Sequence, residues 1–252
     1  MEKKNLCFII AHRYYRNYKS FLKYYIDNIN KFYENSLIII VDNNSKHLED
    51  IRIMLGDFEN IVILTNETNS KFEPGAYNVG IRYVLDHELD YKYYIFTQDN
   101  FVLKNKFDFN DLEKNGIVAC ALNHFTEDCT NWNQTDDTCQ RILRSIHVSD
   151  RTNEFNLCWC NSFILHHSRL ETYYEIMKNE IVTTRLESEK FERYQSGILF
   201  YLNNMNYRSI GGDIKHLHLD YDCWKVHVEN DDSIKAFFVK TVQQKNEHTP
   251  EN

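Results

Sequence analysis

The sequence predicts an α/β protein with a mostly parallel central sheet and helices on both faces of that sheet. Two observations support this prediction. Short apolar runs alternate with amphipathic segments of helical spacing through the first hundred residues, and several of these runs end in Asp or Asn. No linker or internal repeat interrupts the 252 residues, so we expect one domain, residues 1–252.

The first half of the chain repeats a strand followed by a helix. Continuous apolar runs of this kind are typical of parallel strands buried on both faces, and they predict strands at 6–11, 36–41, 61–65 and 93–97. Apolar residues spaced by three and four predict helices at 14–32, 48–55 and 75–87.

The second half is less regular. It predicts strands at 116–122 and 157–165, helices at 170–177 and 186–202, and a histidine-bearing tail at 214–228. Residues 123–156 are rich in Asn, Asp and Thr without a clear period, which favours an elaborated binding loop.

Charge and cysteine content exclude several classes of protein. The net charge is −8 and the basic residues are scattered, so we expect no nucleic-acid partner. The apolar run at 6–10 is too short for a signal sequence or a membrane span, so we expect a cytoplasmic protein without an integral membrane segment.

The seven cysteines lack paired spacing and are expected to be reduced thiols. A local metal or disulfide staple among Cys129, Cys139, Cys158 and Cys160 is the alternative.

Polar residues follow the predicted parallel strands at 11–13, 42–45, 66–75 and 98–100. Ligands of such sheets bind beyond the carboxyl ends of the strands, so we expect these residues to meet at one edge. Asp42 is a candidate contact for a nucleotide base or ribose, and the alternative is that it caps the following helix. Asp99, beside Gln98 and an Asn, offers oxygen ligands for Mg²⁺ or Mn²⁺, although an Asp after a strand also forms turns.

Residues 66–81 contain one of the two prolines and two of the seven glycines. Gly75 would let backbone amides at a helix start approach a diphosphate, and Gly80 would permit close packing against the sheet. The alternative, a tight loop followed by a helix with a small-residue face, accounts for both glycines but not for Asn78 between them.

In this order the motifs resemble the glycosyltransferases of GT-A fold, most of all the family-2-like nucleotide-sugar transferases. The matching segments are the Asp turn at 41–45, the Gly-Ala-x-Asn-x-Gly segment at 75–80 and the strand end at 96–100. The resemblance covers residues 5–100 and implies a Rossmann-like GT-A domain. Residues 1–104 would bind the nucleotide sugar, residues 105–230 the acceptor, and residues 231–252 would form a tail.

The resemblance implies a donor site and a metal site. The donor, a UDP-sugar in preference to a GDP-sugar, would be bound by Ala11, His12, Arg13, Asp42, Asn66, Gly75, Asn78, Gln98 and Asp99. Thr97 stands where the family has its first Asp, so Asp99 would be the single carboxylate on Mn²⁺ or Mg²⁺. His216 or His218 would be the second protein ligand.

The resemblance also implies an inverting transfer to a glycan or protein acceptor, which needs a carboxylate base. Tyr194 and Gln195 stand where the family has Glu-Asp, so the base is expected at Glu192 and next at Glu189, with Glu187 nearby. The alternative is that these are solvated glutamates in the first turns of a helix. Trp132 and Trp159 are available for stacking on sugar rings.

Two other functions are left open. A catalytically inactive carbohydrate-binding module would explain the single Asp and the missing Glu-Asp pair. A sugar nucleotidyltransferase has a similar sheet but usually begins with a glycine-rich loop, and residues 11–15 contain no glycine.

Overall fold

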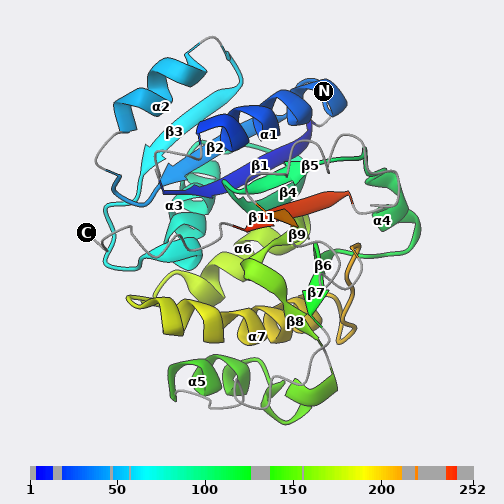
Figure 1. Ribbon diagram of the computed structural model, residues 1–252. Coiled ribbons are helices and arrows are strands. Elements are labelled where there is room, and N and C mark those ends of the chain that lie inside the picture. Colours follow the sequence, from blue (N-terminus) through cyan, green and yellow to red (C-terminus); the bar gives the residue numbers. More distant parts are fainter. Residues whose placement is uncertain are drawn as a thin grey trace.

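The protein is built on a six-stranded sheet covered by helices (Figure 1). A computed structural model describes residues 4–13, 19–45, 48–56, 58–125, 137–154, 156–211, 219–220 and 237–242. The strand order is β3 (Ile61–Thr65), β2 (Leu37–Asp42), β1 (Lys4–His12), β4 (Tyr91–Gln98), β9 (Phe163–His166) and β6 (Ala119–Ala121). The first four are parallel, and β9 runs antiparallel to both β4 and β6. The predicted mostly parallel sheet is therefore confirmed.

Alternate residues of each strand face opposite layers, as the period of a strand requires. In β1, Cys7 and Ile9 belong to the layer packed on α3 (Phe72–Asp86), α6 (His167–Met177) and α7 (Arg185–Leu202). Phe8 and Ile10 belong to the layer packed on α1 (Lys19–Phe32), α2 (Leu48–Leu55) and α4 (Asn110–Lys114). Helices thus cover both faces of the sheet, as expected.

A separate three-stranded sheet and a further helix lie outside the six-stranded sheet. β5 (Phe101–Leu103), which follows β4, pairs antiparallel with β11 (Phe238–Val242), and β11 pairs with β10 (Leu219–Asp220). The carboxy-terminal part of the chain thereby returns to the end of β4. α5 (Asp137–Ser145) packs against α7 on the side away from the sheet (Figure 1).

The prediction of one strand at 157–165 is wrong. The structure has β8 (Leu157–Cys158), paired with β7 (His124–Phe125), then a 3-10 turn η3 (Trp159–Asn161), and only then β9. Cys160 and Asn161 adopt φ of 55° and 49°, left-handed conformations that a strand cannot contain. Residues 123–156, which the sequence predicted to be an irregular loop, include α5 and another 3-10 turn, η2 (Ser149–Glu154).

The cysteines that the structure describes with their side chains are buried and form no disulfide. They are Cys7, Cys120, Cys158 and Cys160. The disulfide considered for the segment that contains Cys158 and Cys160 therefore does not join Cys158 to Cys160. Among the described residues, no helix is long and apolar enough to cross a membrane.

Candidate functional site

The carboxyl ends of the parallel strands lie at one edge of the sheet, as their register requires. His12 pairs in register with Asp42, and Asp42 with Thr65. On the other side of β1, Ala11 pairs with Gln98, and the Asp99 amide donates to the Ala11 carbonyl at 3.0 Å. The polar residues expected at one edge are therefore brought together.

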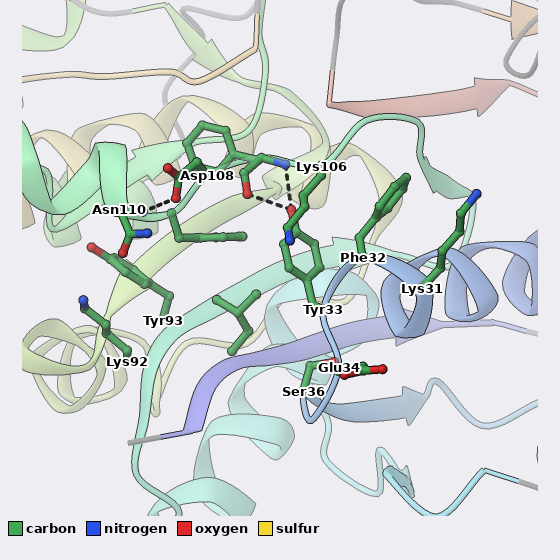
Figure 2. Close-up of a pocket in the computed structure, with 13 residues that line it drawn as sticks. Lys31, Phe32, Tyr33, Glu34, Ser36, Lys92, Tyr93, Lys106, Asp108 and Asn110 are labelled. Atoms are coloured by element: carbon green, nitrogen blue, oxygen red, sulfur yellow. Dashed lines mark hydrogen bonds between the residues drawn. The ribbon is translucent and has the colours of Figure 1, made fainter. Parts of the chain in front are cut away.

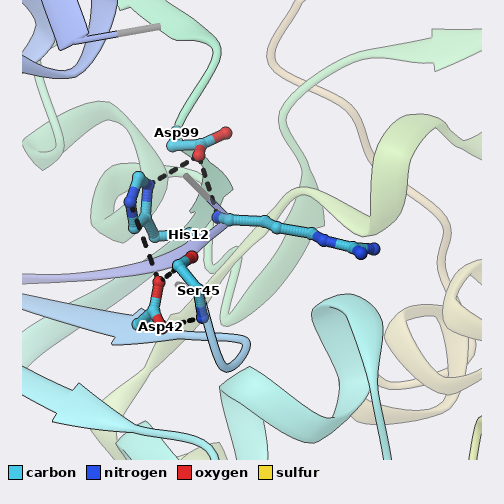
Figure 3. A network of polar contacts seen from close by, with 5 residues as sticks. His12, Asp42, Ser45 and Asp99 are labelled. Carbon is cyan, nitrogen blue, oxygen red and sulfur yellow. Dashed lines mark hydrogen bonds and ion pairs between the residues drawn. The ribbon is translucent and has the colours of Figure 1, made fainter. Parts of the chain in front are cut away.

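His12 lies between the two acidic strand ends (Figure 3). Its Nδ1 is 2.7 Å from Asp99 Oδ2, and the Arg13 amide donates to the same oxygen at 3.0 Å. Because an ionised carboxylate only accepts hydrogen bonds, Nδ1 is the donor. His12 Nε2 faces Asp42 Oδ1 at 3.8 Å and has no hydrogen bond within the described residues. One imidazole, 2% exposed, thus joins β1, β2 and the end of β4.

Asp42 is fully buried and holds the turn that follows it. Ser45 donates its amide to Oδ2 at 2.7 Å and its hydroxyl to Oδ1 at 2.5 Å. The alternative considered from sequence was a cap of the following helix. Asp42 instead holds the turn at Ser45, ahead of α2, which begins at Leu48, and it also lies beside His12.

Asp99 is the accessible carboxylate of the pair, with 13% of its side chain exposed. Oδ2 accepts from His12 and from the Arg13 amide, and no hydrogen bond from the described residues is made to Oδ1. A carboxylate oxygen is the kind of ligand that Mg²⁺ and Mn²⁺ take. The chemistry therefore fits a divalent cation with one protein ligand here. Within the described part of the chain, no group of three or more His, Cys, Asp or Glu could hold a metal alone.

Thr97, at the position of the absent first Asp, has a structural role. It is completely buried, and its hydroxyl lies 3.0 Å from the Tyr25 hydroxyl of α1. A carboxylate at this position would be buried beside the Tyr25 hydroxyl, and burying its charge there would be unfavourable.

Asn66 organises the loop between β3 and α3. Its amide nitrogen donates to Asn43 Oδ1 and to the Ser70 carbonyl, both at 2.8 Å, and its Oδ1 accepts from Thr68. Gly75 packs against this loop so closely that a Cβ there would lie 2.0 Å from the Ser70 carbonyl oxygen. Gly75 is therefore required by the close approach of two backbone segments.

Asn78 points to a different part of the molecule. Its amide nitrogen donates to the Met177 carbonyl at the end of α6, at 2.8 Å. Gly80 faces the sheet, where a Cβ would lie 2.6 Å from Ile9 Cγ2. The expected close packing at Gly80 is present. Asn78 is not brought together with the strand-end residues.

The three glutamates of α7 have different surroundings. Glu187 completes a capping box with Thr184, and hydrogen bonds from the Thr183 and Thr184 amides lower its pKa. Glu189 accepts from Arg185 Nε at 2.7 Å. Glu192 is half-buried and lies near Cys158. Burial raises the pKa of that thiol well above its usual value, and the charge of Glu192 raises it further.

The positions where the resemblance expects Glu-Asp are in the core. Tyr194 is 2% exposed and Gln195 is 1% exposed. Gln195 Oε1 accepts from the Tyr173 hydroxyl at 2.9 Å. Neither side chain is placed to reach an acceptor at the edge of the sheet.

Glu73 is a site residue that the sequence reasoning missed. It lies in the first turn of α3 and accepts hydrogen bonds from Gln98, next to Asp99, and from the Ser188 hydroxyl of α7 at 2.7 Å. The sequence signal was an acidic residue directly before Pro74 and Gly75 at the strand-to-helix loop. His216, His218 and Trp132 lie outside the described residues, and nothing is described for the side chain of Trp159.

A cavity of about 460 Å³ lies at the opposite edge of the sheet (Figure 2). Leu6, Ser36 and Lys92, near the amino ends of the parallel strands, contribute to its lining. The Tyr33 hydroxyl donates to the Phe107 carbonyl at 3.0 Å and accepts from the Phe107 amide at 2.8 Å. None of the site residues expected from sequence lines this cavity.

Several solved structures are similar to this chain. No protein-family model and no curated protein sequence matches the chain. Residues 1–349 of TarS from S. aureus, in a crystal structure with UDP-GlcNAc, are 11% identical with a TM-score of 0.53, over 98% of this chain and 60% of that one. The mannosyltransferase Ktr4p from S. cerevisiae, in complex with GDP, is 12% identical with a TM-score of 0.43, over 80% of this chain and 66% of that one. The 4-diphosphocytidyl-2C-methyl-D-erythritol synthase from Anaerococcus prevotii is 13% identical with a TM-score of 0.44, over 82% of this chain and 86% of that one.

The likeness to TarS confirms the predicted GT-A fold. This chain spans about 60% of the length of that TarS fragment.

Proposed function

We propose that the protein is a glycosyltransferase that moves a sugar from a nucleoside-diphosphate donor to a glycan or glycoprotein acceptor, with inversion at the anomeric carbon. The observation that supports this proposal is the strand-end arrangement, in which His12 lies between Asp42 and Asp99. Ligands of parallel sheets bind at this edge. The TarS fragment of similar fold was crystallised with UDP-GlcNAc, which supports a UDP-sugar over a GDP-sugar.

The donor nucleoside is proposed to lie over the ends of β1 and β2. Asp42 would accept a hydrogen bond from the base or the ribose in place of the one that the Ser45 hydroxyl now donates. The loop held by Asn66 and Gly75 leads into α3, whose first amides would face the diphosphate.

Asp99 would hold Mn²⁺ or Mg²⁺ through its second carboxylate oxygen, with His12 and the Arg13 amide fixing the first. Such an ion neutralises negative charge on the leaving diphosphate. His216 or His218 remains the proposed second ligand. Chain topology supports it, since β10 begins directly after His218 and belongs to the same small sheet as β5, which begins two residues after Asp99.

Glu192 is the proposed base. Glu187 caps α7 and Glu189 is paired with Arg185, whereas Glu192 lies further along the helix and is half-buried. Its carboxylate would take the proton of the acceptor hydroxyl as that oxygen attacks the anomeric carbon. We propose the cytoplasm as the compartment, because the buried thiols of Cys7, Cys120 and Cys158 form no disulfide among the described residues.

Calorimetry of donor binding tests the donor site. With Mn²⁺ present, Asp99→Ala should abolish binding of UDP and of UDP-sugars. Asp111→Ala on α4, which removes an exposed carboxylate elsewhere, should leave it unchanged. Equal affinity of the Asp99→Ala and wild-type proteins would remove Asp99 from the site.

Turnover tests the base and the alternative of an inactive carbohydrate-binding module. Glu192→Gln should slow nucleotide-sugar hydrolysis while donor affinity is kept, and Glu171→Gln, at an exposed position of α6, should not. Full activity of Glu192→Gln would exclude Glu192 as the base. A wild-type protein that binds glycans but hydrolyses no donor would favour the binding module.

A further inference from the structure

A second polar cluster adjoins the strand-end site, on the face of the sheet covered by α3 and α7. We infer that Glu73, with Ser188, Gln98 and Asn161, binds hydroxyl groups of the sugar carried by the donor and selects a neutral sugar over a uronic acid. This inference rests on the proposed function and names the class of sugar transferred.

The cluster joins three elements that are far apart in the sequence. Ser188 Oγ of α7 donates to Glu73 Oε2 at 2.7 Å, and Gln98 Nε2 at the end of β4 donates to Glu73 Oε1. The carboxylate is half-buried and held by one donor on each oxygen. Two carboxylate oxygens offer about four acceptor positions, so Glu73 can accept further hydrogen bonds from a ligand.

Asn161 supplies an independent sign of a ligand. It is 2% exposed, and its amide nitrogen donates to the Ser188 carbonyl at 3.3 Å. Its Oδ1 is buried without a hydrogen-bond partner within the described residues. A buried carbonyl oxygen without a donor is unfavourable, and a ligand hydroxyl would satisfy it. The left-handed conformations of Cys160 and Asn161 are of the kind that persists at binding sites.

The chemistry of the cluster indicates what it binds. Glu73 and Asn161 both offer oxygen acceptors, and the hydroxyl groups of a pyranose are matching donors. Gln98 directly precedes Asp99, so the cluster lies next to the proposed position of the diphosphate, where the sugar of the donor would be. A carboxylate on the sugar would meet the negative charge of Glu73 and could not donate to it. A neutral hexose therefore fits, and a uronic acid does not.

Three ligands separate sugar recognition from nucleotide recognition: UDP, UDP-glucose and UDP-glucuronate, titrated by calorimetry with Mn²⁺ into the full chain. UDP-glucose and UDP-glucuronate differ only at C6. The wild-type protein should bind UDP-glucose at least about tenfold more tightly than UDP-glucuronate, as expected for hydrogen bonds to a charged acceptor. If GDP binds instead of UDP, GDP-mannose and GDP-mannuronate take the place of the uridine compounds.

The variants assign this preference to Glu73. Glu73→Gln should bring the affinities for UDP-glucose and UDP-glucuronate to within about threefold of each other and leave the affinity for UDP unchanged. Ser188→Ala, which keeps the carboxylate but removes one of its donors, should reduce the preference in part. Glu59→Gln makes the same chemical change at an exposed position before β3 and should retain the wild-type preference.

The outcomes distinguish the inference from the proposed function. Absence of binding by both UDP and GDP would defeat the proposed function and the inference with it. Nucleotide binding without a preference for the neutral sugar would defeat the inference alone. A Glu73→Gln protein that melts lower but keeps the wild-type preference would show that Glu73 only stabilises the start of α3.

Discussion

The hydrogen bond between His12 and Asp99 should contribute measurably to the stability of the fold. His12 is 2% exposed, and its Nδ1 lies 2.7 Å from Asp99 Oδ2, within the normal range for a charge-assisted hydrogen bond. A hydrogen bond to a charged group contributes a net of about 1.5–3 kcal/mol. His12→Ala should therefore lower the free energy of unfolding by at least about this amount, because it also leaves a small cavity.

A double-mutant cycle isolates the bond from the cavity. Unfolding in urea, followed by far-ultraviolet circular dichroism, gives the free energies of His12→Ala, Asp99→Ala, the double variant and the wild type. The coupling energy should be about 1.5–3 kcal/mol. His12→Asn should recover part of the loss, since its amide nitrogen can stand near the position of Nδ1. A coupling energy below about 0.5 kcal/mol would refute the assigned role of the bond.

Two further substitutions test the loop before α3 and the start of α7. Gly75→Ala would place a Cβ 2.0 Å from the Ser70 carbonyl oxygen and should cost about 1–3 kcal/mol in urea unfolding, and an unchanged midpoint would contradict this packing. Hydrogen bonds from Thr183 and Thr184 lower the pKa of Glu187, so its contribution to stability is present above its ordinary pKa of 4.5 and is lost as the pH falls through the lowered value. Melting temperatures measured between pH 6 and about pH 3 should therefore fall less steeply for Glu187→Gln than for the wild type.

The sequence predicts the first half of the fold well, because parallel strands that are buried on both faces appear in the sequence as continuous apolar runs. The run at 61–65 coincides with β3, and the run at 36–41 lies one residue from β2. The strand ends also met as expected, since parallel register places them at the same edge. The start of α3 was predicted three residues late, at Gly75, because the residues up to Pro74 were taken as part of the loop.

The second half could not be predicted in the same way. An apolar run at 157–165 does not reveal that Cys160 and Asn161 take left-handed conformations. The hydrogen bonds of these two residues go to Gln98 and Ser188, which are far away in the sequence. Glu73 was missed for a related reason. Its partners are 25 and 115 residues away, so no local pattern joins them.

The buried thiols of Cys7 and Cys120 could be used to measure how often the sheet around them opens. Burial raises the pKa of Cys120 to about 12 and also raises that of Cys7, so neither forms the reactive thiolate in the folded state. Both side chains are fully buried, but Cys7 lies on β1, an interior strand of the sheet, whereas Cys120 lies on β6, the strand at the edge of the sheet. An alkylating reagent reaches either thiol only when the structure around it opens. The rate at which such a reagent labels Cys7 would therefore follow the opening of the interior of the sheet, and the rate at Cys120 would follow the opening of the edge formed by β6.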